Sequence, residues 1–362
     1  MNLVSRLILL TSGILVSYAL ANPNITIQRT VHQPLNTNVE YSVVSHGSKE
    51  TKIALICAPK IIGKYAQSTY DVALATLLGK HQDLFSLKRF NMPDESAESL
   101  AQAIQQARQE GFSAILAPLT LAGAQRLSTL ESGIDVFIPT VHKRDVPNAP
   151  DNFTFGAIDY VRQIEALVPY MSSGIAIFYD DSNVGMQLKK ETEALFMESN
   201  KAKKSIASYR VDAQGDNIIS YLSKPSSFSK KSVILHIPVV KSAILTAHLT
   251  FTGIKNRNIL STQINVDPTL LTLTQYIDRK NMLLANSIVE HSADIDGSNA
   301  LLNNDITFDW INYTTSVGSD YLIAALSDSP RNYSLRIVDG QVIYPVEILK
   351  AEAFGFEPII SE

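Results

Sequence analysis

The stretch that decides the fold is Gly174 to Phe196, GIAIFYDDSNVGMQLKKETEALF. It opens with a compact apolar strand, Ile175 to Tyr179, and a polar loop of Asp, Ser, Asn and Gly residues follows. From Met186 onward, apolar residues recur between charged ones, as in an amphipathic helix. A strand, a loop and a helix in this order form the repeating motif of a parallel sheet. Ligands of such sheets usually bind at the carboxyl ends of the strands.

The same alternation extends outward over most of the chain. Before the deciding stretch, strands and helices are predicted in turn at 53–58, 65–78, 85–90, 97–110, 112–117, 122–130 and 136–141. From it onward, strands are predicted at 175–179, 205–211, 233–237 and 258–264, with helices at 186–198, 216–222, 242–252 and 270–277. Asp339-Gly340, between apolar runs at 333–338 and 342–349, predicts a two-residue hairpin. Short buried strands alternating with helices predict a doubly wound α/β protein.

The amino terminus has the pattern of a secretory signal peptide. Arg6 supplies the positive charge, an apolar core follows, and Ala19-Leu20-Ala21 predicts cleavage after Ala21. The core is about ten residues long and too short to span a bilayer. The chain has a single cysteine, Cys57, which excludes a disulfide framework and is expected to be a small buried core residue. Export without disulfides favours a bacterial periplasm, with no membrane insertion after signal cleavage.

Composition and motifs exclude several kinds of function. A formal net charge of −4 on 362 residues gives no electrostatic case for binding nucleic acid. The seven histidines lack metal-ligand spacing, and no phosphate-binding, dinucleotide-binding or nucleophile-elbow motif occurs. Asp180 and Asp181 are adjacent and point in different directions along extended chain, so a loop-forming role is favoured over acid–base catalysis. We predict no cofactor, no metal site and no catalytic residue.

Four further patches resemble the type I periplasmic-binding-protein fold, especially its leucine-binding branch and the related domain of LpoA-type regulators of peptidoglycan synthases. They are IALICAPKIIGKYAQSTYDVALA (53–75), ILAPLTLAGAQRL (115–127), FTFGAIDYVRQIEALVPY (153–170) and SVGSDYLIAAL (316–326). The resemblance implies two discontinuous lobes joined by a hinge, with a ligand in the cleft. It divides the chain into a signal peptide (1–21), an N-terminal extension of possible edge strands or flexible leader (22–51), lobe 1 (52–146 plus 285–327) and lobe 2 (147–284 plus 328–362).

The resemblance also implies where a ligand is held. Patch 115–127 is similar to a helix N-terminus whose Ser or Thr and backbone N–H groups take a ligand carboxylate, which makes Thr120 a ligand-binding candidate. The alternative is that Thr120 only caps this helix. The other cleft candidates are Lys60, Tyr65, Asp181, Asn183 and Lys241.

Two positions depart from the amino-acid-binding members. Those members present an aromatic residue just before the loop glycine, where this chain has Val184, and an acidic residue after a later strand, where it has Lys241. Because a buried ammonium group without a countercharge is costly, a zwitterionic amino acid is disfavoured. Two functions stay open. One is a non-catalytic periplasmic protein that binds a protein partner of the cell envelope as a regulator or scaffold. The alternative is a solute-binding protein of an ABC importer for a small anionic organic ligand.

Overall fold

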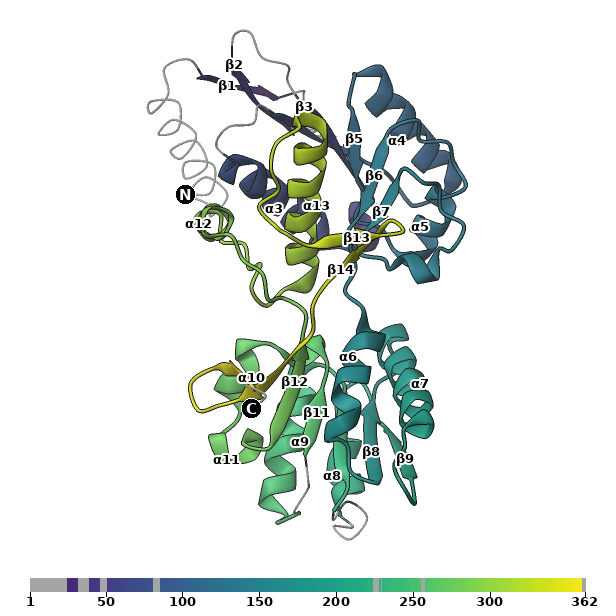
Figure 1. Cartoon of the computed structure of the whole chain (residues 1–362), viewed down its shortest axis with the longest axis vertical. Helices are drawn as coiled ribbons and strands as arrows, with labels where there is room; N and C mark the ends of the chain where they lie inside the picture. The colour runs from purple at the N-terminus through teal and green to yellow at the C-terminus, as the bar shows by residue number, and fades with distance from the viewer. Residues whose placement is uncertain are drawn as a thin grey trace. The chain divides into compact units, whose positions relative to one another are not determined.

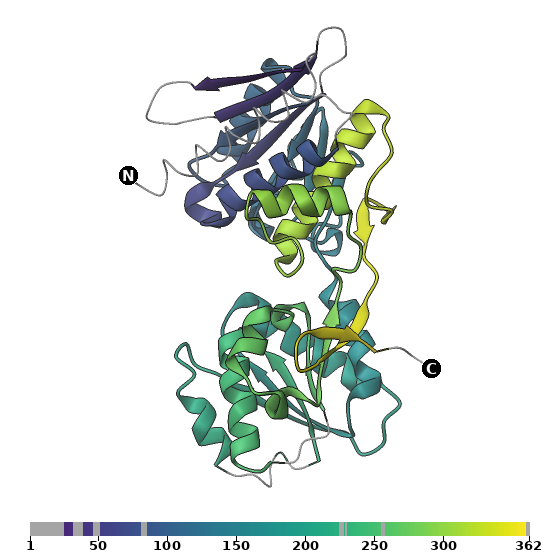
Figure 2. The same ribbon diagram turned by 90° about the vertical axis from the view of Figure 1, so that its left-hand side faces the viewer.

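The computed structural model describes residues 25–31, 39–45, 51–80, 85–223, 228, 230–254 and 258–359. The predicted signal peptide and its cleavage site lie outside these residues. The chain divides into two compact units: unit 1 holds 1–158 and 290–343, and unit 2 holds 159–289 and 344–362. Each unit is a sheet with helices on both faces (Figures 1 and 2). The prediction of two doubly wound α/β lobes is therefore confirmed.

Unit 1 is built on a nine-stranded sheet with the order β1-β2-β4-β3-β5-β6-β7-β14-β13. Strands β4, β3, β5, β6, β7 and β14 run parallel, whereas β2 joins β4 antiparallel, with Tyr41 opposite Leu87. Of the two alternatives left open for the N-terminal extension, residues 25–31 and 39–45 are strands of this sheet, and β1 is its edge. The strands are β1 (Ile25–Val31), β2 (Val39–Ser45), β3 (Thr51–Cys57), β4 (Phe85–Asn91), β5 (Ala114–Leu116), β6 (Asp135–Ile138), β7 (Phe153–Phe155), β13 (Arg336–Val338) and β14 (Gln341–Ile343).

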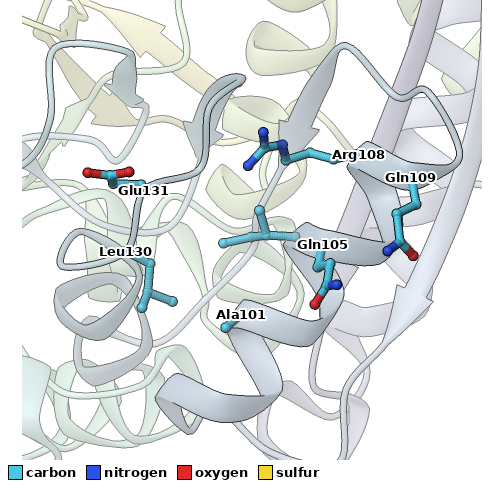
Figure 3. Close-up of a pocket in the computed structure, with 7 residues that line it drawn as sticks. Ala101, Gln105, Arg108, Gln109, Leu130 and Glu131 are labelled. Atoms are coloured by element: carbon cyan, nitrogen blue, oxygen red, sulfur yellow. The ribbon is translucent and has the colours of Figure 1, made fainter.

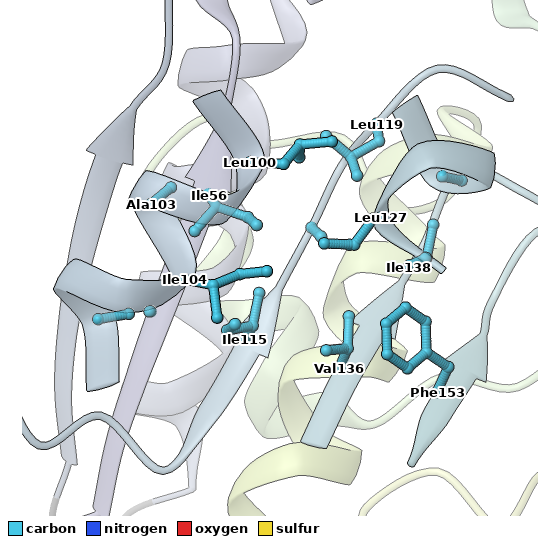
Figure 4. Packing of buried hydrophobic residues seen from close by; sticks show 14 of the residues in the cluster. Ile56, Leu100, Ala103, Ile104, Ile115, Leu119, Leu127, Val136, Ile138 and Phe153 are labelled. Atoms are coloured by element: carbon cyan, nitrogen blue, oxygen red, sulfur yellow. The ribbon is translucent and has the colours of Figure 1, made fainter. Parts of the chain in front are cut away.

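Helices cover both faces of the unit 1 sheet (Figure 1). One face carries α3 (Tyr65–Gly79), α12 (Ala293–Leu301) and α13 (Trp310–Ser327); the other carries α4 (Ala97–Gln109) and α5 (Leu121–Leu127). Two shorter helices are α2 (Pro59–Ile62) and η1 (Lys143–Asp145). Under α4 and α5, apolar side chains such as Ile56, Leu100, Ile115, Leu127 and Phe153 form one buried cluster (Figure 4). Burying each such side chain contributes about 1.5–3 kcal/mol, so this cluster holds both helices on the sheet.

Helix α13 contacts the sheet at a glycine, where there is no room for a larger side chain. A Cβ atom on Gly318 would lie 2.3 Å from Cδ1 of Phe137 on β6. Beyond this contact, the buried carboxylate of Asp320 lies 3.1 Å from Nζ of Lys80 and accepts the N–H groups of Asn332 and Tyr333. These bonds fasten the segment after α13 to the core of unit 1.

Unit 2 contains a seven-stranded sheet with the order β16-β15-β12-β11-β10-β8-β9. The five strands from β12 to β9 are parallel, and β15 and β16 close one side as antiparallel strands. Their bounds are β8 (Gly174–Tyr179), β9 (Ser205–Arg210), β10 (Ser232–His236), β11 (Ile259–Ser261), β12 (Met282–Asn286), β15 (Glu347–Ala351) and β16 (Phe356–Pro358).

The helices of unit 2 also lie on both faces of its sheet. Helices α6 (Tyr160–Leu167) and α7 (Asn183–Glu198) pack together over a buried cluster that includes Ile164, Leu188 and Phe196. Helix α9 (Val239–Phe251) contacts α8 (Asn217–Leu222), α10 (Pro268–Leu273) and α11 (Tyr276–Arg279). The 3₁₀ turns η2 (Val168–Tyr170) and η4 (Gln263–Asn265) complete the unit.

Two predicted elements are wrong, one for a local reason and one because of the tertiary packing. The helix predicted at 270–277 is two helices, because Gln275 and Asp278 form a capping box that starts α11 as a new helix. The strand predicted at 342–349 is split between β14 of unit 1 and β15 of unit 2. The hairpin at Asp339-Gly340 is confirmed: both residues have positive φ and join β13 to β14. This hairpin, assigned to lobe 2 from the sequence, pairs with β7 of unit 1.

Candidate functional site

The predicted ligand-binding residues all follow the carboxyl ends of parallel strands, three in each unit. In unit 1, Lys60 and Tyr65 come after β3 and Thr120 comes after β5. In unit 2, Asp181 and Asn183 come after β8, and Lys241 comes after β10.

Of these residues, Thr120 takes part in the most hydrogen bonds. It is the N-cap of α5, and its hydroxyl oxygen accepts the N–H of Gly123 over 3.2 Å. The same hydroxyl donates to Oε2 of Glu95, and the Thr120 backbone N–H donates to Oε1 of Glu95 over 3.0 Å. The hydroxyl and the backbone N–H of Thr120, which are among the donors that the resemblance assigns to a ligand carboxylate, are therefore bonded to a carboxylate of the chain itself.

Glu95 is held in this position from several sides. Its side chain is buried, with 2% of its surface exposed, and Arg126 of α5 donates to its backbone oxygen over 3.1 Å. A Cβ atom at position 123 would lie 2.4 Å from Oε2 of Glu95, so only glycine leaves space for the carboxylate. A carboxylate at this point also interacts favourably with the positive end of the α5 dipole. Sequence analysis missed Glu95, because its partner Thr120 is 25 residues away and no motif joins them.

Near β3, the two remaining unit 1 candidates differ in their surroundings. Lys60 is exposed on α2, whereas Tyr65 is half-buried, with Nζ of Lys64 lying 5.0 Å from its ring centroid. Burial, and then the nearby Asp309 carboxylate, raises the pKa of Tyr65. Burial likewise raises the pKa of Asp309, which caps α13 by accepting the N–H groups of Ile311 and Asn312.

In unit 2, the loop of the deciding stretch is organised by Asp180. Its Oδ1 accepts the hydroxyl of Ser182 over 2.5 Å, and the Ser182 oxygen accepts the Gly185 N–H over 2.9 Å. Asp181 instead forms an exposed ion pair with Nη2 of Arg210 at 2.5 Å. Asp180 thus supports the Ser182 cap of α7 and Asp181 pairs on the surface, in keeping with the predicted loop-forming role.

The other unit 2 candidates lie on helices. Asn183 is the first residue of α7 and is exposed, as is the neighbouring Val184. Lys241 lies in the first turn of α9, half-exposed, and its Cγ atom lies beside Gly215.

The described residues contain no cluster of three or more His, Cys, Asp or Glu side chains that could hold a metal ion. Cys57 is buried as predicted, and burial raises the pKa of its thiol to about 11, so it stays protonated and unreactive at neutral pH. His236 is also buried, with Nε2 2.8 Å from the Thr192 hydroxyl, and burial lowers its pKa to about 3. Among the described helices, none has both the length and the apolar character that crossing a membrane requires.

No family model and no curated protein matches the chain. Several solved structures do. The leucine-binding protein LivK of Thermotoga maritima is 13% identical, with a TM-score of 0.61 over 86% of this chain and 98% of that chain. A branched-chain amino acid ABC transporter protein of Thermus thermophilus with bound valine is 13% identical, with a TM-score of 0.63 over 87% and 96%.

The C-domain of LpoA from Haemophilus influenzae, a regulator of PBP1A, is similar over the whole of its length. It is 12% identical, with a TM-score of 0.53, and the match covers 86% of this chain and 100% of that chain. At these identities the likeness concerns the fold. Together with the two parallel sheets and their flanking helices, it shows that the chain has the type I periplasmic-binding-protein fold, which leucine-binding proteins and the LpoA C-domain share.

Proposed function

We propose that this chain is a non-catalytic periplasmic protein that uses a solute-binding-protein fold to bind a protein partner of the cell envelope, as a regulator or scaffold. The observation that carries the proposal is the Glu95 carboxylate on Thr120. A free carboxylate ligand would have to displace a buried, hydrogen-bonded carboxylate that belongs to the same chain. Leaving a buried charged group unpaired costs about 1–3 kcal/mol or more, which lowers the net affinity for any such ligand.

The unit 2 positions support the same proposal. Val184 and Lys241 stand where amino-acid-binding members have an aromatic residue and an acidic residue, and Asp181 is paired with Arg210. A ligand ammonium group would therefore meet a lysine rather than a carboxylate at that position. The LpoA C-domain supplies a precedent, since the same fold there belongs to a regulator of PBP1A.

The alternative function is solute binding for an ABC importer, with a small anionic organic ligand. Its support is the pair of exposed lysines, Lys60 and Lys64, after β3, together with the similarity to transporter-associated binding proteins. The candidates Thr120, Lys60, Tyr65, Asp181, Asn183 and Lys241 stay predictions for that ligand.

A thermal-shift experiment separates the two functions. The purified mature chain is heated alone and with millimolar leucine, valine, glutamate, succinate or acetate. A ligand present at 100 times its Kd adds about 2.7 kcal/mol of stability, which raises Tm by roughly 5–10 °C for a domain of this size. We expect no such rise. A reproducible rise with one-to-one binding by calorimetry would establish solute binding instead.

A second experiment tests partner binding directly, by chemical crosslinking of intact envelopes that contain the full chain. Partner binding predicts one discrete crosslinked species that recurs between preparations and disappears when the protein is denatured before crosslinking. Recovery of the monomer alone contradicts the proposal.

A further inference from the structure

A groove runs along the outer side of α4 in unit 1. Figure 3 shows its lining: one wall is α4, and the other is the connection between α5 and β6, which carries Leu130 and Glu131. The groove has a volume of about 480 Å³. The α4 residues recur at helical spacing and so share one face: Ala101, Ile104, Gln105, Arg108 and Gln109.

The groove has an apolar floor. Ile104 is buried, and the half-buried Leu130 packs against the core cluster under α4. Ala101 is small and exposed, so one end of the helix face is open. Such a floor accepts an aliphatic side chain and gains roughly 25 cal/mol for each Å² of apolar surface that is buried.

The polar groups around the floor differ from those on the neighbouring side of the same helix. There, polar side chains satisfy one another: Gln102 donates to Glu98, Gln106 donates to Glu110, and Glu110 pairs with Lys88. In the groove, within the part of the chain that the structure describes, Arg108 and Glu131 form no ion pair, and Gln105 and Gln109 form no side-chain hydrogen bond.

The Arg108 guanidinium group lies beside the turn at Gly133. A Cβ atom on Gly133 would lie 3.1 Å from Cζ of Arg108, so the guanidinium group lies against the backbone at that glycine. Gly133 has a φ of +67°, which residues with a side chain rarely adopt. Glycine therefore suits this turn both because of its φ and because it leaves space for Arg108. A guanidinium with a free planar edge binds carboxylates through two parallel hydrogen bonds.

We propose that this groove is the docking site for a segment of the envelope partner. The segment presents an aliphatic side chain to Ile104 and Leu130, a carboxylate to Arg108 and a basic side chain to Glu131. This inference rests on the proposed function and adds the surface and its chemistry. A protein segment fits better than a small molecule, because most of the lining residues are exposed and such an open groove cannot enclose the 70–90% of a ligand's surface that small-molecule sites bury.

The probes that test the proposal are acetylated, amidated pentapeptides added to the full mature chain with methyl-labelled isoleucine and leucine. Two acidic–basic probes, Gly-Asp-Leu-Lys-Gly and its reverse, cover both directions of binding, and Gly-Asn-Leu-Gln-Gly is the uncharged control. The methyl resonances of Ile104 and Leu130 report binding. We expect at least one charged probe to shift both signals in a saturable way, with at least tenfold weaker binding of the uncharged probe.

Two variants make the test specific to the groove. Arg108→Gln should abolish the preference for the charged probe, whereas Arg162→Gln, which removes an equal charge from an exposed position on α6, should retain it. Because both positions are exposed, neither substitution should change Tm. An unchanged Tm then shows that each variant is folded. Equal binding of all probes, an unaffected Arg108→Gln variant, or no shift at millimolar peptide would overturn the proposal. If envelope crosslinking still yields a partner in that case, the proposed function is retained and the partner binds another surface of the chain.

Discussion

The two units contain the same capping arrangement with a carboxylate from a different source. In unit 1, the Thr120 hydroxyl accepts the Gly123 N–H and donates to Glu95. In unit 2, the Ser182 hydroxyl accepts the Gly185 N–H and donates to Asp180. The Asp180 carboxylate lies two residues from its serine, whereas Glu95 comes from 25 residues away and is buried.

The difference separates a local capping device from a tertiary one. Asp180 organises its own loop and is partly in contact with water, so its loss affects the first turn of α7. Glu95 joins the start of α4 to the start of α5 and accepts both the hydroxyl and the backbone N–H of Thr120. Disruption of the Glu95 arrangement should therefore cost more stability.

The largest expected effect concerns pH and unit 2. Because burial lowers the pKa of His236 to about 3, the unfolded chain binds a proton between about pH 6.5 and pH 3 that the folded chain does not. The free energy of unfolding of unit 2 should be constant above pH 6.5 and fall by up to about 4 kcal/mol as the pH drops toward 3.

Hydrogen exchange of the β10 amides, followed from pH 7 to pH 4, measures this fall. His236→Gln should flatten the profile, whereas His291→Gln, a surface change in unit 1, should leave it unchanged. If the free energy of unfolding of His236→Gln falls with pH as steeply as that of the unchanged protein, His236 is not the group responsible.

The second effect tests the glycines of the two caps. Gly123→Ala should lower the stability of unit 1 by about 3 kcal/mol, because the new Cβ would lie 2.4 Å from a buried carboxylate. Gly185→Ala should cost unit 2 about 2 kcal/mol: the Asp180 side chain can turn toward water, but the new Cβ would also lie 2.9 Å from the Asp180 backbone oxygen, so the loop itself must shift.

Urea unfolding followed by the fluorescence of Trp310, the only tryptophan, reports unit 1, and hydrogen exchange reports unit 2. Gly297→Ala on α12 is the matched control: its Cβ meets nothing within 4 Å, so the helix should be slightly more stable. A loss for Gly123→Ala no greater than that for Gly185→Ala would remove the distinction between the two caps.

Third, the carboxylates themselves can be neutralised without a change of shape. Glu95→Gln should destabilise unit 1 by about 2 kcal/mol, because charge-assisted hydrogen bonds to Thr120 are replaced by weaker ones at a buried site. Asp180→Asn should cost at most about 0.5 kcal/mol. Urea unfolding followed by Trp310 measures the loss in Glu95→Gln, and hydrogen exchange measures the loss in Asp180→Asn. Similar losses in the two variants would count against a special role for Glu95.

The smallest effects are expected in the exposed part of the unit 2 loop. Ser182→Ala removes a helix cap and should cost about 1 kcal/mol. Asp181→Asn removes only a solvent-exposed ion pair with Arg210 and should leave Tm unchanged, since such pairs contribute little. A drop in Tm for Asp181→Asn as large as that for Ser182→Ala would show that the ion pair organises the loop.

Much of the fold followed from the sequence because its signals are local. Alternating apolar and polar segments predicted most strands and helices, and Asp339-Gly340 predicted the β13–β14 hairpin. The break at Gln275 was missed because the apolar pattern continues through it while the capping box starts a new helix. Likewise, the apolar run 342–349 is one stretch of sequence, but only the packing assigns its two ends to different sheets.

The candidate site divides in the same way. By itself, the sequence determined the strand–loop–helix motifs and offered a helix cap as one of two roles for Thr120, since each depends on neighbouring residues. Only the tertiary structure decided that Glu95 occupies the donors of Thr120 and that the free side of Arg108 lies in a groove. These contacts join segments brought together by burial of the core under α4 and α5, and no residue spacing encodes such proximity.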